Sequence, residues 1–136
     1  MKKKPDIICI GSVLWDVIGR STAKMNLAAD QPGKIIRIPG GVALNLAMSL
    51  QQNGFNSLIL SVIGKDHEGD QLIKELKSRR IITDYIYRTN EFPTDSYMAI
   101  EGSNGLVGAI ADTQTLEKCE ENILSPLKNG NLRTRD

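Results

Sequence analysis

The sequence is poor in the residue types that carry most nucleophilic and metal-dependent chemistry. Its 136 residues include a single histidine, His67, and two cysteines, Cys9 and Cys119. No Ser/His/Asp or Cys/His constellation can be built from one histidine, and His67 lies in a polar turn typical of a solvated residue. The cysteine spacing fits no metal site, and Cys9 lies in an apolar run as a small core residue would. We therefore expect no metal ligands and a reducing, cytoplasmic setting.

The sequence also lacks the glycine-rich motifs that bind phosphate groups. Gly33-Lys34 and Gly64-Lys65 are its only Gly-Lys pairs, and they are followed by Ile35 and Asp66 where a Walker A motif has Ser or Thr. No G-x-G-x-x-G follows the first apolar run either. These absences exclude a P-loop and remove the strongest sign of a dinucleotide-binding domain.

Long apolar runs and an excess of one charge are absent as well. No run approaches the length of a membrane span, and 17 basic residues stand against 16 acidic ones. Residues 7–15 are mostly apolar, but Asp16 interrupts them and no small-x-small cleavage site follows, which favours a strand over a signal peptide. We expect a single domain with no nucleic-acid or membrane partner.

The most informative stretch present is Pro39–Gly54, which predicts a glycine-led helix. Apolar residues recur with a period of 3.6, and Gly54 stands where a left-handed C-cap would end the helix. Gly40 and Gly41 at its start permit close approach to the backbone, and the helix start offers unpaired N–H groups to ligand oxygens. Asn45 falls within the first two turns. A glycine-rich turn before a core helix, with Asn45 on the solvent-exposed face of that helix, explains the same pattern without a ligand.

The order of the remaining patterns predicts an α/β fold. Strands are expected near 7–10, 58–63 and 83–87, and helices over 41–53 and 67–79, with Asp66 as the N-cap of the second helix. Residues 12–16 read as a loop or strand exit. Segments within 17–38 and 95–111, the second of which carries a hairpin signal, are expected to form a separate small β layer. A last helix over 115–123 and a polar, frayed tail over 128–136 complete the prediction.

A series of motifs in this order and spacing resembles the N-terminal half of ribokinase-like (PfkB-type) carbohydrate kinases. The motifs are Gly11-x-x-x-x-Asp16, Gly40-Gly41-x-x-x-Asn45-x-Ala47-x-x-Leu50 with Gly54, and Val62-x-Gly64-x-Asp66-x-x-Gly69. Within this family, Asn26–Lys34 and Ser96-Tyr97 before Ala109–Asp112 are most similar to pseudouridine kinases. Arg80 stands where many relatives have glycine. The resemblance covers about residues 6–124.

The resemblance implies a mainly parallel sheet flanked by helices, with a small β-sheet lid over the site of the phosphate acceptor. It implies that Asp16 binds sugar hydroxyls, that Gly40 and Gly41 give the backbone approach, and that Asn45 reaches the sugar. Lys34, Ser96 and Tyr97 would lie in the lid near a base. If Asp16 binds no ligand, it is a carboxylate in the turn that follows a strand. For Gly64, Asp66 and Gly69 we favour helix capping and close packing over ligand contact.

One departure from the family concerns the donor of the phosphoryl group. Family members are longer, and their second half carries a Gly-Ala-Gly-Asp helix start that supplies the catalytic base and the ATP site; no such stretch occurs here. We therefore expect residues 1–127 to be the N-terminal, acceptor-binding part, with the lid from about 17–38 and 95–111, the C-terminal ATP-binding half absent and no catalytic residue in this chain.

Two functions remain open at this point. One is ATP- and Mg²⁺-dependent phosphorylation of a sugar or nucleoside hydroxyl, with pseudouridine converted to its 5'-phosphate, in a full-length parent of which this chain holds the acceptor half and binds no cofactor. The other is a non-catalytic nucleoside-binding or dimerisation fragment, with a homodimer formed through the lid. The coding sequence after Asp136 would discriminate them.

Overall fold

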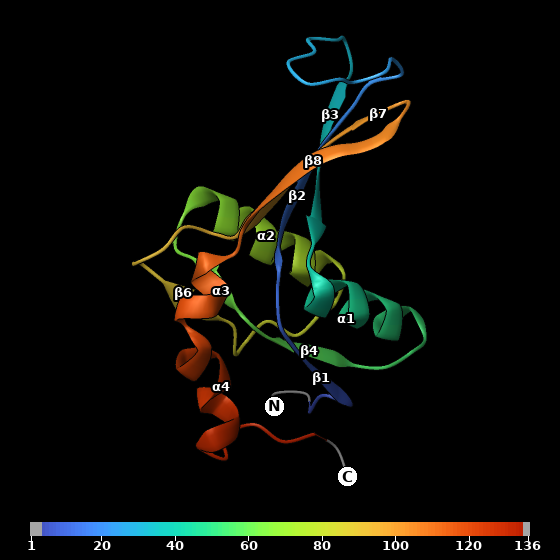
Figure 1. The fold of residues 1–136 in the computed structure, drawn as a ribbon. Coiled ribbons are helices and arrows are strands. Elements are labelled where there is room, and N and C mark those ends of the chain that lie inside the picture. Colours follow the sequence, from blue (N-terminus) through green and yellow to red (C-terminus); the bar gives the residue numbers. More distant parts are fainter. Residues whose placement is uncertain (1–3, 135–136) are drawn as a thin grey trace.

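A computed structural model describes residues 4–134 as an α/β structure in two parts. Short parallel strands lie between helices, and a four-stranded sheet projects away from them (Figure 1). The predicted fold class, a mainly parallel α/β arrangement flanked by helices with a separate small β-sheet, is confirmed. No helix within residues 4–134 is both long and apolar enough to cross a membrane.

The parallel strands form the buried centre of the molecule. β1 (Ile7–Ile10) pairs with β4 (Ser57–Leu60), and β5 (Val62–Gly64) pairs with β6 (Tyr87–Thr89), both in parallel. The first predicted strand is confirmed, whereas the second is interrupted at Ser61. The third was misplaced, because the backbone turns over 83–86 and only a single bridge at Ile82 precedes β6.

Helices cover both faces of these strands. α1 (Val42–Gln52) and α2 (His67–Ser78) pack on the face that carries Cys9 and Ile59, while α3 (Gln114–Lys118) and α4 (Glu120–Lys128) pack on the face that carries Leu58 and Leu60. α1 and α4 accordingly lie on opposite sides of β1 and β4 in Figure 1. The strands are apolar on both faces because each face is covered, as parallel sheets require.

The last predicted helix is in fact two helices. Cys119 ends α3 and begins α4 with a φ of −110°, outside the helical range, and α4 then runs on to Lys128. The tail is not frayed where the structure describes it, because Leu132 is buried in the second hydrophobic cluster and donates its N–H to the carbonyl of Pro126 at 3.2 Å. Residues 135–136 lie outside the described part.

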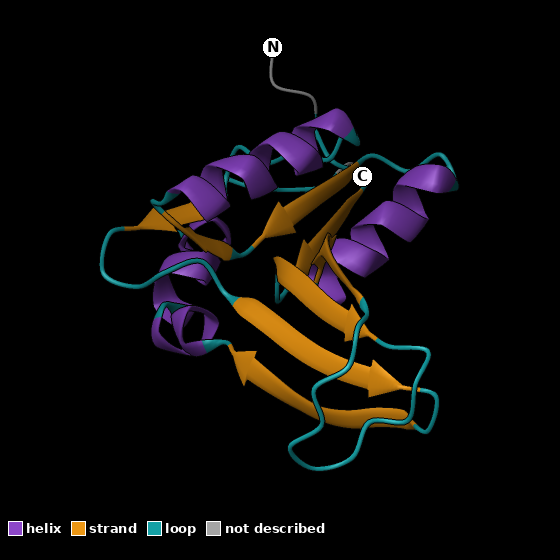
Figure 2. Ribbon diagram, turned by 90° about the horizontal axis from the view of Figure 1, so that it is seen from above, coloured by secondary structure: helices purple, strands orange, loops and turns teal. Residues whose placement is uncertain are grey.

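The projecting sheet has the strand order β3-β2-β7-β8. β2 (Leu14–Arg20) pairs antiparallel with β3 (Lys34–Gly40) and parallel with β7 (Ser96–Gly102), and β7 forms the expected hairpin with β8 (Gly105–Asp112). Figure 2 shows its strands running side by side away from the helices. The expectation that 12–16 is a loop or strand exit was wrong for its second half, because Leu14 already pairs with Gly40 and Asp16 lies inside β2.

Candidate acceptor-binding site

The start of α1 is built around Gly41 and Ser12. Gly41 is the N-cap residue at φ 100°, and a Cβ there would overlap the carbonyl oxygen of Ser12. Ser12 accepts two of the helix's first N–H groups, from Val42 at its Oγ (2.9 Å) and from Ala43 at its carbonyl (3.1 Å). The helix start therefore offers fewer free N–H groups than the sequence led us to expect, because Ser12, which immediately follows the first strand and its Gly11, already caps it.

Gly40 makes room for the carboxylate of Asp16. A Cβ on Gly40 would overlap Oδ2 of Asp16 and lie 2.6 Å from its Cγ. Both residues lie on the same face of the β2–β3 pair, where Leu14 faces Gly40 and Asp16 faces Ile38. The space freed by the two glycines is thus filled by Asp16 and Ser12, so that the glycine pair places protein oxygens at the helix start.

Asp16 is a partly buried carboxylate without a partner in the described part of the chain. None of the hydrogen bonds and ion pairs among residues 4–134 involves its side chain, and burial raises its pKa. A carboxylate removed from water is stabilised when a donor reaches it, and hydroxyl groups are such donors. Asn45 lies in the first turns of α1, where its N–H donates to the carbonyl of Gly41 at 2.9 Å and its side chain is exposed.

The other predicted site residues are divided by the strand alternation of the projecting sheet. Tyr97 lies directly opposite Asp16 on β7, so the two side chains share a face. Ser96 is paired with Trp15 and belongs to the opposite face. Lys34 shares the face of Asp16 but is paired with Arg20, four residues farther along β2. The structure therefore brings together Asp16, Gly40, Gly41 and Tyr97, with Asn45 on the adjoining helix turn, while Ser96 points away and Lys34 lies at the far end.

The face opposite Asp16 anchors the projecting sheet to α2. The guanidinium of Arg37 stacks on the ring of Trp15, 4.0 Å from its centroid, and binds Glu68 and, at 2.5 Å, Gln71. Nε1 of Trp15 donates to the carbonyl of Glu68 at 2.9 Å. Sequence reasoning missed this clamp because its members lie tens of residues apart and follow no period.

Asp66 and Gly64 have the structural roles that the sequence favoured. Asp66 caps α2 by accepting from the N–H of Gly69 (2.7 Å), and it also accepts from the hydroxyl (2.6 Å) and the N–H (2.9 Å) of Thr94. Burial opposes ionisation of Asp66, but these bonds outweigh it and lower its pKa. A Cβ on Gly64 would lie 2.6 Å from the nitrogen of Thr94, so close packing explains this glycine.

Asp95 is a second capping carboxylate, which no sequence pattern predicted. It is 2% exposed and accepts from the N–H groups of Thr115 (3.1 Å) and Leu116 (3.2 Å) at the start of α3. Burial nevertheless raises its pKa. Because Asp95 directly precedes β7 and α3 closely follows β8, this cap ties together the two ends of the hairpin.

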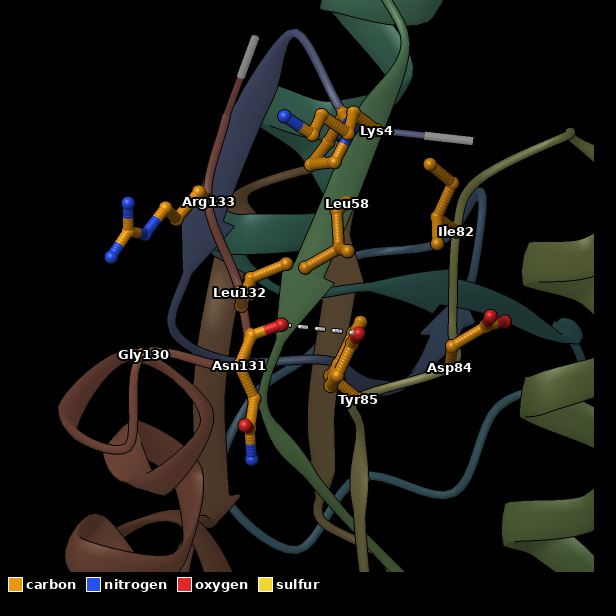
Figure 3. Close-up of a pocket in the computed structure, with 10 residues that line it drawn as sticks. Lys4, Leu58, Ile82, Asp84, Tyr85, Gly130, Asn131, Leu132 and Arg133 are labelled. Atoms are coloured by element: carbon orange, nitrogen blue, oxygen red, sulfur yellow. Dashed lines mark hydrogen bonds between the residues drawn. The ribbon is translucent and has the colours of Figure 1, made fainter. Parts of the chain in front are cut away.

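A pocket of about 220 Å³ at the other end of the parallel strands is not the candidate site. Leu58, Ile82, Tyr85 and Leu132 are among its lining residues, and the Tyr85 hydroxyl donates to the carbonyl of Asn131 at 3.5 Å (Figure 3). It lies near the amino ends of β1 and β4, whereas Gly11 and Ser12 follow the carboxyl end of β1. Ligands of open α/β sheets bind at the carboxyl ends of the strands.

The described residues do not form a fitting site for a nucleotide with its metal ion. Within residues 4–134 there is no group of three or more His, Cys, Asp or Glu side chains that could hold a metal. The sequence has no glycine-rich phosphate loop. What the arrangement can do by itself is present a carboxylate, an amide and a tyrosine to hydroxyl groups at a helix start.

The chain belongs to the pfkB family of carbohydrate kinases, because the model of that family matches residues 4–130. This confirms the resemblance seen in the motif series. Among curated relatives, the pseudouridine kinase of Escherichia coli is 32% identical over 105 residues, which are 77% of this chain and 34% of the relative. The pseudouridine kinase of Arabidopsis thaliana is 27% identical, over 88% of this chain and 30% of the relative. The chain thus spans about a third of the length of these relatives.

Solved structures agree on the fold. A carbohydrate kinase from Agrobacterium tumefaciens has a TM-score of 0.69 and 26% identity, over 79% of this chain and 35% of that one. A fructokinase with bound ATP from Xylella fastidiosa has a TM-score of 0.65 and 20% identity, over 82% of this chain and 34% of that one. The parallel strands, flanking helices and projecting sheet are therefore those of a ribokinase-like kinase.

Proposed function

We propose that this chain forms the acceptor-binding part of an ATP-dependent carbohydrate kinase, and that the acceptor is pseudouridine. The observation that carries the proposal is the partly buried Asp16 carboxylate, which lies against Gly40 and has no partner among the described residues. Its place beside the start of α1 suits a sugar that approaches the glycine pair. The identity to pseudouridine kinases supports the choice of acceptor.

The chemistry of the acceptor side is orientation. A carboxylate accepts hydrogen bonds from two vicinal hydroxyls, and the Asn45 amide both donates and accepts, so the pair can fix a ribose in one pose. Phosphoryl transfer depends almost entirely on such positioning and on electrostatic stabilisation of the transferring group. Asp16 and Asn45 would supply the first of these and leave the second to residues outside this chain.

The donor side of the reaction is proposed to lie in a longer protein. In that protein the Gly-Ala-Gly-Asp stretch typical of the family would supply the base, and ATP with Mg²⁺ would bind beside it. The described residues offer no fitting group for that pair, so no catalytic step is assigned to them.

Binding and turnover test the proposal separately. Calorimetry with pseudouridine should show binding that Asp16→Ala weakens by roughly 1–3 kcal/mol, because donors on the sugar lose their acceptor. Glu121→Ala, at an exposed carboxylate of α4, is the matched control and should bind normally. In an assay with pseudouridine and ATP, the 136-residue chain should form no product, whereas a longer version with the Gly-Ala-Gly-Asp stretch should. Unchanged affinity in Asp16→Ala, or turnover by the short chain, would refute the corresponding half of the proposal.

A second candidate is a non-catalytic nucleoside-binding fragment that forms a homodimer through the projecting sheet. Large apolar side chains are exposed on both faces of that sheet, among them Ile35 (81% exposed) and Ile110 (71%) on one face and Ile38 (43%) on the other. Such surfaces favour association. Sedimentation of the wild type beside Ile35→Lys and Ile38→Lys would identify the face used; a monomer at every concentration would exclude this candidate.

A further inference from the structure

Arg37 connects the outer strand of the projecting sheet to a helix. β3 lies at the edge of the strand order β3-β2-β7-β8, and its residues 34–38 are exposed. Within the described part of the chain, Arg37 is the one residue of this exposed stretch whose side chain bonds to a helix, with Glu68 and Gln71 of α2 as partners. The placement of the exposed part of β3 against α2 therefore depends on Arg37.

This clamp lies directly behind Asp16. On β2, Asp16 stands between Trp15, whose ring carries the Arg37 guanidinium, and Val17, whose pairing partner on β3 is Arg37 itself. Consecutive Cα atoms are about 3.8 Å apart, and neighbouring side chains of a strand point to opposite faces. The clamp thus holds the backbone before and after Asp16 from one face of the sheet, while the carboxylate projects from the other.

The two halves of the clamp differ in their exposure to solvent. Trp15 is buried, and its backbone N–H donates to the carbonyl of Asp95 at 3.2 Å. The side chains of Arg37 and Glu68 are 35% and 48% exposed, and a hollow of about 490 Å³ opens beside Arg37. Ion pairs that solvent reaches are weakened by salt. The Arg37–Glu68 pair is therefore the part of the clamp that salt can loosen.

Loosening the clamp would disturb the seat of the carboxylate. Gly40, which makes room for Oδ2 of Asp16, follows Arg37 by three residues on the same strand. Because Asp16 pairs with Ile38 between these two positions, a displacement of β3 from α2 carries the Asp16 backbone with it. The carboxylate then loses its fixed position at the start of α1. A site that is competent for only part of the time has its apparent affinity reduced by that fraction.

We propose that Arg37 is a positioning residue for the acceptor, because it clamps the projecting sheet to α2 and so holds the Asp16 carboxylate at the start of α1. The inference rests on the proposed function of Asp16. Pseudouridine carries no charge, so salt has little effect on its own hydrogen bonds and acts on the Arg37–Glu68 pair instead. The affinity of the chain for this neutral ligand should therefore fall as the salt concentration rises.

The test is calorimetry of the 136-residue chain with pseudouridine between about 0.01 M and 1 M salt, where the Debye length falls from about 30 Å to 3 Å. The wild type should lose affinity roughly threefold over this range. Arg37→Met should bind roughly threefold to tenfold more weakly at low salt and show no further salt dependence. Glu68→Gln retains the stack on Trp15, so its affinity should lie between the two, also without salt dependence.

Lys74→Met is the matched control, because it removes one positive charge from the lining of the same hollow without touching the clamp. It should keep the affinity and the salt dependence of the wild type. Amide chemical shifts of the unliganded chain give a second readout: those of Asp16 and Ile38 should change in Arg37→Met and stay unchanged in Lys74→Met. Where Arg37→Met does not remain folded, Glu68→Gln decides the question.

The outcomes separate the inference from the proposed function. Wild-type affinity in both clamp variants, beside a clear loss in Asp16→Ala, would overturn the positioning role and leave the proposed function standing. A loss in Arg37→Met or Glu68→Gln that keeps the salt dependence of the wild type would also overturn the positioning role. Undiminished binding by Asp16→Ala would refute the proposed function itself, and no binding by the wild type would overturn both.

Discussion

The contact between Gly40 and Asp16 makes a sharp prediction, because one methyl group should disable a side chain on a neighbouring strand. In Gly40→Ala the new Cβ would overlap Oδ2 of Asp16, and the carboxylate would have to rotate away. Forcing a side chain from its preferred rotamer costs of order 0.5–1.5 kcal/mol, a loss of stability that the fold can tolerate. The carboxylate would then no longer point at the acceptor site.

The expected loss of pseudouridine affinity equals that of Asp16→Ala, about 1–3 kcal/mol or roughly fivefold to 150-fold. If Gly40→Ala acts through Asp16, the double variant should bind no more weakly than either single one. Gly108→Ala in β8 is the control, because a Cβ there meets nothing within 4 Å. Calorimetry measures the four variants beside the wild type. Additive losses in the double variant, or normal binding by Gly40→Ala, would refute the view that Gly40 serves to seat Asp16.

Three further predictions concern stability and are measured by denaturant unfolding. Arg37→Ala should lower the free energy of unfolding by about 1–2 kcal/mol through loss of the Trp15 stack and the bonds to α2, and Arg37→Lys should restore only part of it; no change would mean that the clamp does not hold the sheet. Arg80→Gly should raise stability by about 0.5–1 kcal/mol, because Arg80 has a φ of 61°, and a decrease would contradict this. Since the pKa of Asp95 is raised, the folded state binds its proton more tightly than the unfolded state, and stability should fall as the pH rises above about 3.8; Asp95→Asn should remove that fall, and an unchanged slope would exclude the assignment.

The features that the sequence predicted correctly are those encoded by neighbouring residues. The 3.6-residue period of 41–53 and 67–79 gives α1 and α2 within a residue or two, and Asp66 caps α2 because an N-cap bonds only three residues ahead. The hairpin of β7 and β8 follows from glycines at its corners.

The features it missed depend on partners far along the chain. Asp16 lies inside a strand because β3 and β7 pair on either side of it, and neither pairing has a local signal. The turn over 83–86 delays β6 to Tyr87, although the sequence pattern predicted a strand near 83–87. The Arg37–Trp15–Glu68 clamp joins two strands to a helix through contacts of the Trp15 and Arg37 side chains, so no periodicity in the sequence could predict it.

The glycine pair shows how the two kinds of information combine at the site. From the sequence, Gly40 and Gly41 read as space left open for a ligand. In the structure that space is taken by Asp16 and Ser12, each from a segment that precedes the helix by more than twenty residues. The contacts that place the carboxylate thus come from β2, β3, β7 and the start of α1, all of which this chain contains. A preformed group of this kind requires little reorganisation when a ligand binds, so the ability to hold an acceptor can be tested in the 136-residue chain independently of the ability to phosphorylate it.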